Sequence, residues 1–189
     1  YIQVPTTLLA MVDSSIGGKN GVNTKEGKNL IGTIWQPVLI LIDINFLEKL
    51  PDEEFLNGMA EIVKIAVSRD VSFFRFLSDN KEKIISRKQD AVLSMVKTAV
   101  ELKKMIVEQD ERETGLRQVL NFGHTIGHAL ERYYNYKKKH GYCISLGIVV
   151  ETCISHLIGS IDENEKIQII DILKDFGLPA ILNKEIDVN

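Results

Sequence analysis

The sequence predicts the end of an α/β domain followed by most of an all-helical domain. Two short apolar segments typical of parallel strands lie within residues 1–43, and helical periodicity continues from residue 44 to the end. A chain of 189 residues, 44% of them hydrophobic, can bury one core, or one core and part of another. We therefore expect a single join near Asp43, with a cleft between residues 1–43 and 44–189.

The two predicted strands lie at opposite ends of the first 43 residues. Residues 1–7 predict a strand that enters a loop, and no initiator Met or strand–helix unit comes before it. Residues 38–43 form the short, continuous apolar run expected of a parallel strand that is covered on both faces. Because such strands need parallel neighbours, we interpret residues 1–43 as the remnant of a parallel sheet.

The rest of the chain is expected to be helical. Apolar residues recur at helical spacing, and Gly177 and Pro179 are expected to stop the last helix. The expected segments are 44–50, 52–68, 70–79, 88–109, 118–135, 141–159 and 163–176.

Composition excludes several function classes. A net charge of −3 and a pI near 5.9 give no general attraction to nucleic acid or anionic membranes, and no apolar run reaches membrane-spanning length. No signal peptide is recognisable. Cys143 and Cys153 form no Cys-x-x-Cys motif, which favours an intracellular protein with reduced thiols.

His124 and His128 are the first candidates for chemistry, because two histidines four residues apart project from one helix face and can hold a metal or an anion. With His140 and with Glu61, which lies in a segment of helical periodicity, they could form a zinc-type site with one position left for substrate. The pattern alone leaves open two structural histidines and a solvated Glu61. His156, in an apolar run, is expected to be structural.

A second candidate is the glycine- and lysine-rich stretch over residues 13–29. Paired glycines let backbone amides approach a ligand closely, and the lysines after them offer charges to a phosphate or alkoxide. The spacing is neither that of a P-loop nor Gly-x-Gly-x-x-Gly. Composition alone favours a surface loop over a ligand-binding loop.

Four segments in this order together resemble 3-dehydroquinate synthase. They are VPTTLLAMVDSSIGGK at 4–19, GMAEIVK at 58–64, DERETGLR at 110–117 and LNFGHTIGHALE at 120–131. The resemblance implies an N-terminal NAD-binding α/β domain and a C-terminal helical metal-binding domain. Residues 1–43 would then be the end of a parallel nucleotide-binding sheet, and 44–189 a helical metal- and substrate-binding domain that is incomplete at its C-terminus. The chain would be an internal fragment, inactive alone, of a cytoplasmic enzyme that forms a homodimer when complete.

The resemblance also implies roles for individual residues. The metal ligands would be Glu61, His124 and His140, with zinc or cobalt as the ion, so His124 and His128 would not both be ligands. Substrate or catalytic positions would be Asp13, Lys19, Asn29, Lys64, Lys103, Arg117, Asn121 and His128. Positions that bind NAD would be Thr6, Thr7, Asp13, Ser14, Lys19, Lys28 and Asn29, with Phe46, Leu50 and Glu54 as looser matches.

The chemistry implied by the family explains these residue types. A seven-carbon keto-acid sugar phosphate is transiently oxidised by NAD, loses phosphate, is reduced again and closes as a carbocycle. A metal with three protein ligands can polarise the hydroxyl and ketone, and lysines with His128 can neutralise the departing phosphate. Arg117 is the expected bidentate clamp for the substrate carboxylate. Because Arg117, Asn121 and His124 are spaced by four and three, we expect them on one helix face.

The sequence departs from the family at one position and leaves three rival functions. The family commonly has Glu after His140-Gly141, where this chain has Tyr142, and a lost carboxylate there could alter a hydrogen bond that supports a metal ligand. Cyclases that make inosose or valiolone rings use substrates without a carboxylate, so Arg117 and Asn121 argue against them. The Gly-Gly-Lys and Asp-Glu-Arg-Glu motifs disfavour iron-type polyol dehydrogenases. The third rival is a non-catalytic metal-binding fragment.

Overall fold

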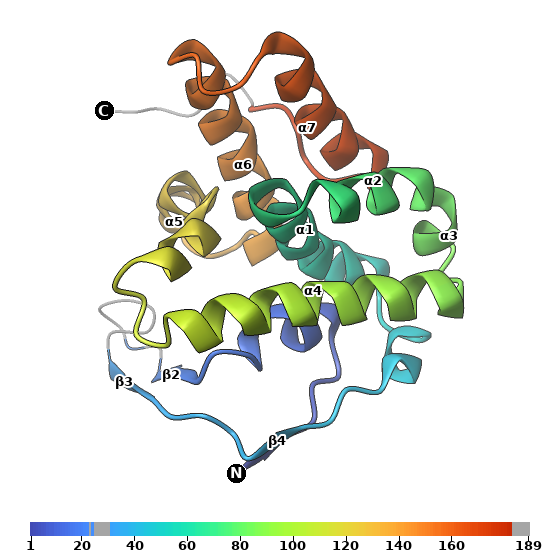
Figure 1. Ribbon diagram of the computed structural model, residues 1–189, viewed down its shortest axis with the longest axis vertical. Helices are drawn as coiled ribbons and strands as arrows, with labels where there is room; N and C mark the ends of the chain where they lie inside the picture. Colours follow the sequence, from blue (N-terminus) through green and yellow to red (C-terminus); the bar gives the residue numbers. More distant parts are fainter. Residues whose placement is uncertain (23, 25–30, 183–189) are drawn as a thin grey trace.

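The computed structural model describes residues 1–22, 24 and 31–182 (Figure 1). Seven α-helices follow a short N-terminal part that contains the strands. They are α1 (Asp52–Arg69), α2 (Val71–Asp79), α3 (Lys81–Ile85), α4 (Gln89–Gln109), α5 (His124–Tyr133), α6 (His140–Leu157) and α7 (Glu163–Asp175). Three shorter turns are a π-helix, η1 (Ala10–Ser14), and two 3₁₀-helices, η2 (Ile44–Leu47) and η3 (Leu116–Asn121).

The predicted parallel strands are present but short. Strand β1 (Ile2–Gln3) pairs in parallel with β4 (Leu39–Ile40), with Ile2 opposite Leu39. Val38 is 82% exposed, and Leu39 and Leu41 are also exposed. The prediction of a strand covered on both faces is therefore wrong for the described part of the chain, although its parallel pairing is confirmed.

The glycine- and lysine-rich stretch contains a strand that the sequence pattern did not predict. Strand β2 (Lys19–Val22) pairs antiparallel with β3 (Ile31–Ile34), and every residue of both strands is exposed. A strand without a buried face carries no apolar alternation, which is why periodicity gave no signal here. The Tyr1 hydroxyl donates to the Trp35 carbonyl oxygen at 2.9 Å and links this hairpin to β1.

Helix α1 is the centre of the helical part, with α4 on one side and α6 and α7 on another (Figure 1). Met59, Ile62 and Ile65 on α1 are fully buried. Leu8 and Met11, from the segment before and within η1, lie in the same core. Packing in this core holds η1, α1 and α4 together, and so brings the polar residues of these three elements close to one another.

Most predicted helices are confirmed within a few residues, but one is wrong. The segment 118–135 is not continuous: η3 ends at Asn121, and α5 begins at His124 after Gly123, which adopts φ 77°. A Cβ on Gly123 would lie 2.6 Å from Ile148 Cγ1, so the residue also permits close packing of α5 against α6. The segment 44–50 is a 3₁₀-helix of four residues, and α3 and η1 were not predicted.

Candidate functional site

A polar cavity of about 430 Å³ lies where η1, β2, α1, α4, η3, α5 and α6 meet. It brings together most of the site residues predicted from the sequence. Its lining comprises Asp13, Ser14, Ile16, Lys19, Gly21, Lys64, Lys103, Glu113, Arg117, Leu120, Asn121, His124, His128 and His140.

Glu61, His124 and His140 form a cluster at one wall of this cavity, with one donor atom from each residue within 4.8 Å of the others. The Nε2 atoms of His140 and His124 lie 3.1 and 3.4 Å from the same atom, Glu61 Oε1. Ligands about 2.0–2.1 Å from a tetrahedral zinc ion lie roughly 3.3 Å from one another. The three residues therefore fit a divalent ion in both donor type and spacing.

The outer nitrogens of both histidines face acceptors. His124 Nδ1 lies 3.3 Å from the Phe122 carbonyl oxygen, and His140 Nδ1 lies 3.1 Å from Glu131 Oε1. A proton on each Nδ1 leaves the Nε2 lone pair free to bind an ion. Helix α6 approaches α1 closely enough for this because Gly141 has no side chain: a Cβ there would lie 2.4 Å from the Asn57 carbonyl oxygen.

Burial and charge oppose each other in the cluster. Burial raises the pKa of Glu61, but Lys64 and the two histidines outweigh it and hold that pKa well below its usual range. Burial lowers the pKa of His140, but contacts with Glu131 and Glu61 raise it to about 9. At His124, burial lowers the pKa more than the charge of Glu61 raises it, so the pKa lies below its usual value. The cluster thus holds an ionised carboxylate that attracts cations.

Two buried lysines stand beside this carboxylate. Lys64, 2% exposed, forms an ion pair of 2.5 Å with Glu61 Oε2. Lys103 donates to the Asp13 carbonyl oxygen at 2.7 Å and also pairs with the Asp13 carboxylate. Burial lowers the pKa of Lys103, whereas Glu61 and Asp13 outweigh burial and raise the pKa of Lys64. Both side chains line the cavity and can neutralise an anion there.

Arg117 lines the cavity as predicted, but its visible contacts are with the main chain. It donates to the Glu111 carbonyl oxygen at 2.6 Å and to the Gly17 carbonyl oxygen at 3.1 Å. Gly17 has φ 106°, and a Cβ there would lie 2.2 Å from Arg117 Nη2. The expected single helix face is wrong, because Gly123 separates Arg117 and Asn121 from His124. The three residues meet in the cavity across this break.

Two glutamates of the site were missed from the sequence. Glu113 pairs with Lys19 and accepts from Asn121 Nδ2 at 2.8 Å. Glu131 is 2% exposed and contacts both His128 and His140. Each glutamate belongs to a motif quoted above, but its distance in sequence from its partners did not identify it as a site residue. The contacts of Glu113 join different elements, and Glu131 shares its carboxylate between two histidine rings.

The predicted NAD positions are not gathered in this cavity. Of these positions, Asp13, Ser14 and Lys19 line it, whereas Thr6 is exposed elsewhere and Thr7 Oγ1 accepts from the Ala10 amide at 3.2 Å. Phe46 is exposed on η2, Leu50 packs against the core, and Glu54 accepts from Lys139 Nζ at 2.6 Å. Lys28 and Asn29 lie outside the described residues.

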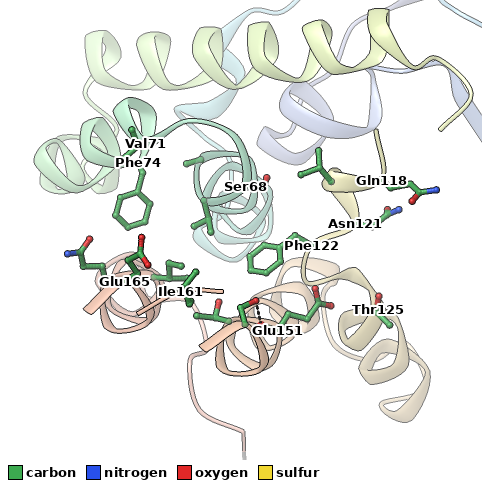
Figure 2. Close-up of a pocket in the computed structure, with 17 residues that line it drawn as sticks. Ser68, Val71, Phe74, Gln118, Asn121, Phe122, Thr125, Glu151, Ile161 and Glu165 are labelled. Carbon is green, nitrogen blue, oxygen red and sulfur yellow. Dashed lines mark hydrogen bonds between the residues drawn. The ribbon is translucent and has the colours of Figure 1, made fainter. Parts of the chain in front are cut away.

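A second, larger cavity of about 710 Å³ is lined by residues of α1, α2, η3, α5, α6 and α7. Figure 2 shows Phe74, Phe122 and Ile161 around it, and its lining is mainly apolar. Glu151 in its wall accepts from the Gly123 amide at 2.7 Å. This cavity lacks the cations and the histidine cluster, so the chemistry belongs to the smaller, polar one.

Two parts of one protein family match the chain. Residues 1–57 match the family described as 3-dehydroquinate synthase N-terminal, and residues 58–189 match 3-dehydroquinate synthase C-terminal. The chain belongs to the 3-dehydroquinate synthase family. The polar cavity therefore draws on residues matched by both parts of the family.

Curated 3-dehydroquinate synthases are similar along nearly the whole chain. The enzyme of Thermodesulfovibrio yellowstonii is 50% identical over 99% of the chain and that of Geotalea uraniireducens 47% over 96%. The enzyme of Saccharolobus solfataricus is 46% identical over 94%. The chain spans about half the length of these relatives, 51–52%.

Two solved sugar-phosphate cyclases share the fold. The 2-epi-5-epi-valiolone synthase ValA of Streptomyces hygroscopicus subsp. jinggangensis, with NAD+ and Zn2+ bound, has a TM-score of 0.90 at 30% identity. It matches 96% of this chain and 51% of its own. A 2-deoxy-scyllo-inosose synthase with carbaglucose-6-phosphate, NAD+ and Co2+ has a TM-score of 0.81 at 26% identity, with 100% and 51% coverage.

Tyr142, the departure from the 3-dehydroquinate synthase pattern, packs away from the histidine cluster. Its ring meets Tyr134 edge to face at 6.2 Å, and Lys138 Nζ lies 4.9 Å from its centre. The carboxylate beside His140 comes instead from Glu131 on α5. No helix in the described residues is both long and apolar enough to cross a membrane. Within the same part of the chain, neither Cys143 nor Cys153 forms a disulfide bond.

Proposed function

We propose that the complete protein is a 3-dehydroquinate synthase. It would convert 3-deoxy-D-arabino-heptulosonate 7-phosphate to 3-dehydroquinate and phosphate, with NAD used catalytically and one zinc or cobalt ion. The observation that carries the proposal is the convergence of Glu61, His124 and His140 beside three buried cations in one cavity. Those cations, Lys64, Lys103 and Arg117, are each at most 6% exposed.

The bound groups would supply two kinds of chemistry: hydride transfer by NAD, and polarisation of a hydroxyl and ketone by an ion on Glu61, His124 and His140. The chain's own residues bind and orient the substrate. Lys64 and Lys103 offer charge to the anionic groups of the substrate, and both are desolvated, so each interaction is stronger than in water. His128, with 59% of its side chain exposed, can reach the phosphate and hold a proton for it.

The finer assignments remain part of this proposal. The division at residues 43 and 44, the NAD positions, a homodimer and a cytoplasmic location are predictions drawn from the family resemblance. We also expect residues 1–189 alone not to turn over, since the relatives are about twice as long.

The proposal is tested by product analysis on the intact natural protein. With the keto-acid sugar phosphate and a trace of NAD, we expect release of inorganic phosphate and no accumulation of NADH. Steady NADH production from a polyol without phosphate release would assign the protein to the dehydrogenases instead.

A second candidate is a cyclase that acts on sugar phosphates without a carboxylate, favoured by the TM-score of 0.90 with a valiolone synthase. Arg117→Lys separates the two, because Lys keeps the charge but loses the planar fork. If Arg117 clamps a carboxylate, the variant should lose about 2–4 kcal/mol of transition-state binding free energy for the carboxylated substrate, measured from the ratio of kcat/KM values. The loss should be smaller for a substrate that lacks the carboxylate. An equal loss on both substrates would show that Arg117 only joins the Glu111 and Gly17 loops.

A further inference from the structure

We propose that Glu131 is a positioning residue that fixes the tautomers of His140 and His128. It would keep a proton on Nδ1 of both rings and so present Nε2 of His140 to the ion that Glu61 and His124 share. This inference rests on the proposed metal site. Glu131 itself would not touch the ion.

The geometry of Glu131 supports this role. Its side chain is 2% exposed on α5, and its two oxygens serve two rings: Oε1 lies 3.1 Å from His140 Nδ1, and Oε2 lies 2.8 Å from His128 Nδ1. An ionised carboxylate only accepts hydrogen bonds, so each Nδ1 facing it must donate. A neutral imidazole with its proton on Nδ1 has its lone pair on Nε2.

The consequence for His140 follows from its other nitrogen. His140 Nε2 lies 3.1 Å from Glu61 Oε1, so the ring spans from one buried carboxylate to the other and, without an ion, donates a hydrogen bond to each. An ion at Glu61 would take the place of the Nε2 proton, while the proton on Nδ1 continues to face Glu131. His124 is held in the same sense by a weaker acceptor, the Phe122 carbonyl oxygen at 3.3 Å. A carboxylate behind a ligating imidazole raises its basicity and fixes its orientation, so Glu131 should strengthen the His140 ligand in particular.

Glu131 could instead be a ligand, because donor atoms of His128, Glu131 and His140 also lie within 4.8 Å of one another. The two clusters differ in how the carboxylate is used. In the first, the single oxygen Glu61 Oε1 faces both Nε2 atoms. In the second, separate oxygens of Glu131 face separate rings whose centres are 6.0 Å apart. That arrangement suits two hydrogen bonds better than one shared ion.

Glu131→Gln tests the role with little change in shape. Its amide offers only one acceptor oxygen, so one of the two Nδ1–H groups would face an NH2 donor. Zinc affinity of the intact natural protein, measured by competition with a chromophoric chelator, should weaken by roughly 10–100-fold. The matched control is Glu101→Gln, an exposed carboxylate on α4 that lies 3.9 Å from Lys97; it should bind zinc like wild type. Unchanged affinity in a folded Glu131→Gln protein would overturn the proposal.

His128→Ala separates the two rings that Glu131 serves. If Glu131 acts through His140, this variant keeps the wild-type zinc affinity, and adding Glu131→Gln to it still weakens binding. If wild type binds a second equivalent of zinc that both Glu131→Gln and His128→Ala remove, Glu131 is a ligand and the positioning role is wrong.

A measurement on the unmutated protein guards against a variant that fails to fold. Long-range ¹H–¹⁵N NMR spectra of the zinc-loaded protein should show His140 bound through Nε2 with its proton on Nδ1, and His128 with the same tautomer. Coordination through His140 Nδ1 would contradict the proposal. These readouts need no turnover, so a protein that binds zinc in this way but releases no phosphate would refute only the proposed function. A protein that binds neither zinc nor cobalt would refute both.

Discussion

At the scale of single residues, the site concentrates charge that a protein interior normally excludes. Lys64 and Glu61 are both almost completely buried, on the same face of α1 and one turn apart. Such a pair has a high desolvation cost, so its presence does not show that it stabilises the fold. Removing one partner is nevertheless strongly destabilising, because the other charge is left buried and unpaired. We interpret this ion pair as serving the cavity, where the negative charges of Asp13 and Glu113 also attract Lys64.

Removing the charge of Lys64 should therefore destabilise the folded protein. Lys64→Met keeps most of the volume but leaves Glu61 without its ion pair, and we expect a loss of about 3–5 kcal/mol in the free energy of unfolding without metal. Zinc should reduce this loss, because an ion on Glu61 supplies the missing positive charge. Denaturant unfolding with chelator and with zinc measures both values.

Lys104→Met provides the comparison for this experiment. Lys104 lies on α4 with 64% of its side chain exposed, 3.6 Å from Glu108. Exposed pairs of this type contribute about 0.3–0.5 kcal/mol. Equal effects of the two substitutions, or a Lys64→Met loss that zinc does not change, would contradict the proposed link between the ion pair and the metal.

At the scale of secondary structure, the break between η3 and α5 decides where the site residues lie. Periodicity predicted the positions of most helices because their buried faces repeat every three to four residues. It did not predict this break, because the left-handed Gly123 packs against Ile148 on α6, a contact between residues distant in sequence. The polar residues were found from their motifs, whereas the role of Glu131 required the α5–α6 packing.

Gly123→Ala tests the importance of that break. A side chain there has a backbone cost of about 1–2 kcal/mol. It would also clash with Ile148, and overpacking of this kind costs about 1–3 kcal/mol. Gly159→Ala is a matched control, since Gly159 has φ 76° but nothing within 4 Å of its added Cβ. We expect Gly123→Ala to lower the free energy of unfolding more than Gly159→Ala. Equal losses would mean that α5 can move away from α6.

Asp110 organises the loop that precedes η3. Its carboxylate accepts from the Thr114, Gly115 and Arg117 amides at 2.9, 2.8 and 3.0 Å. These bonds, first that from Arg117, lower the pKa of Asp110 to about 2 from an ordinary 3.8. A lowered pKa in the folded state means that the stabilisation is present above the ordinary pKa and is lost as the pH falls toward 2.

Asp110→Ala should therefore destabilise the protein at neutral pH and progressively less in acid. Comparing the free energies of unfolding of wild type and variant between pH 6 and the acid limit of folding measures the difference. Asp79→Ala, at an exposed position on α2, serves as control. A difference between wild type and Asp110→Ala that stays constant across this range would contradict the assigned hydrogen bonds.

At the scale of the whole molecule, the segment that follows β1 and the helices share one core, and the polar cavity lies where they meet. The segment after β1 supplies Asp13, α1 supplies Glu61 and Lys64, and α5 and α6 supply the histidines. Residues from the two matched family parts thus line one cavity. Sequence motifs alone could identify these residues, but only the packing of α1 against α6 shows that Glu61 and His140 meet.

If Glu61, His124 and His140 hold one divalent ion, the metal content of the protein should depend on each of these ligands. Zinc and cobalt are measured per chain by elemental analysis, after dialysis, in the intact wild-type protein and in variants shown to be folded by circular dichroism. We expect one equivalent in wild type and His128→Ala, and none in His124→Ala or His140→Ala. A full equivalent retained by folded His124→Ala and His140→Ala proteins, or lost on His128→Ala alone, would contradict it.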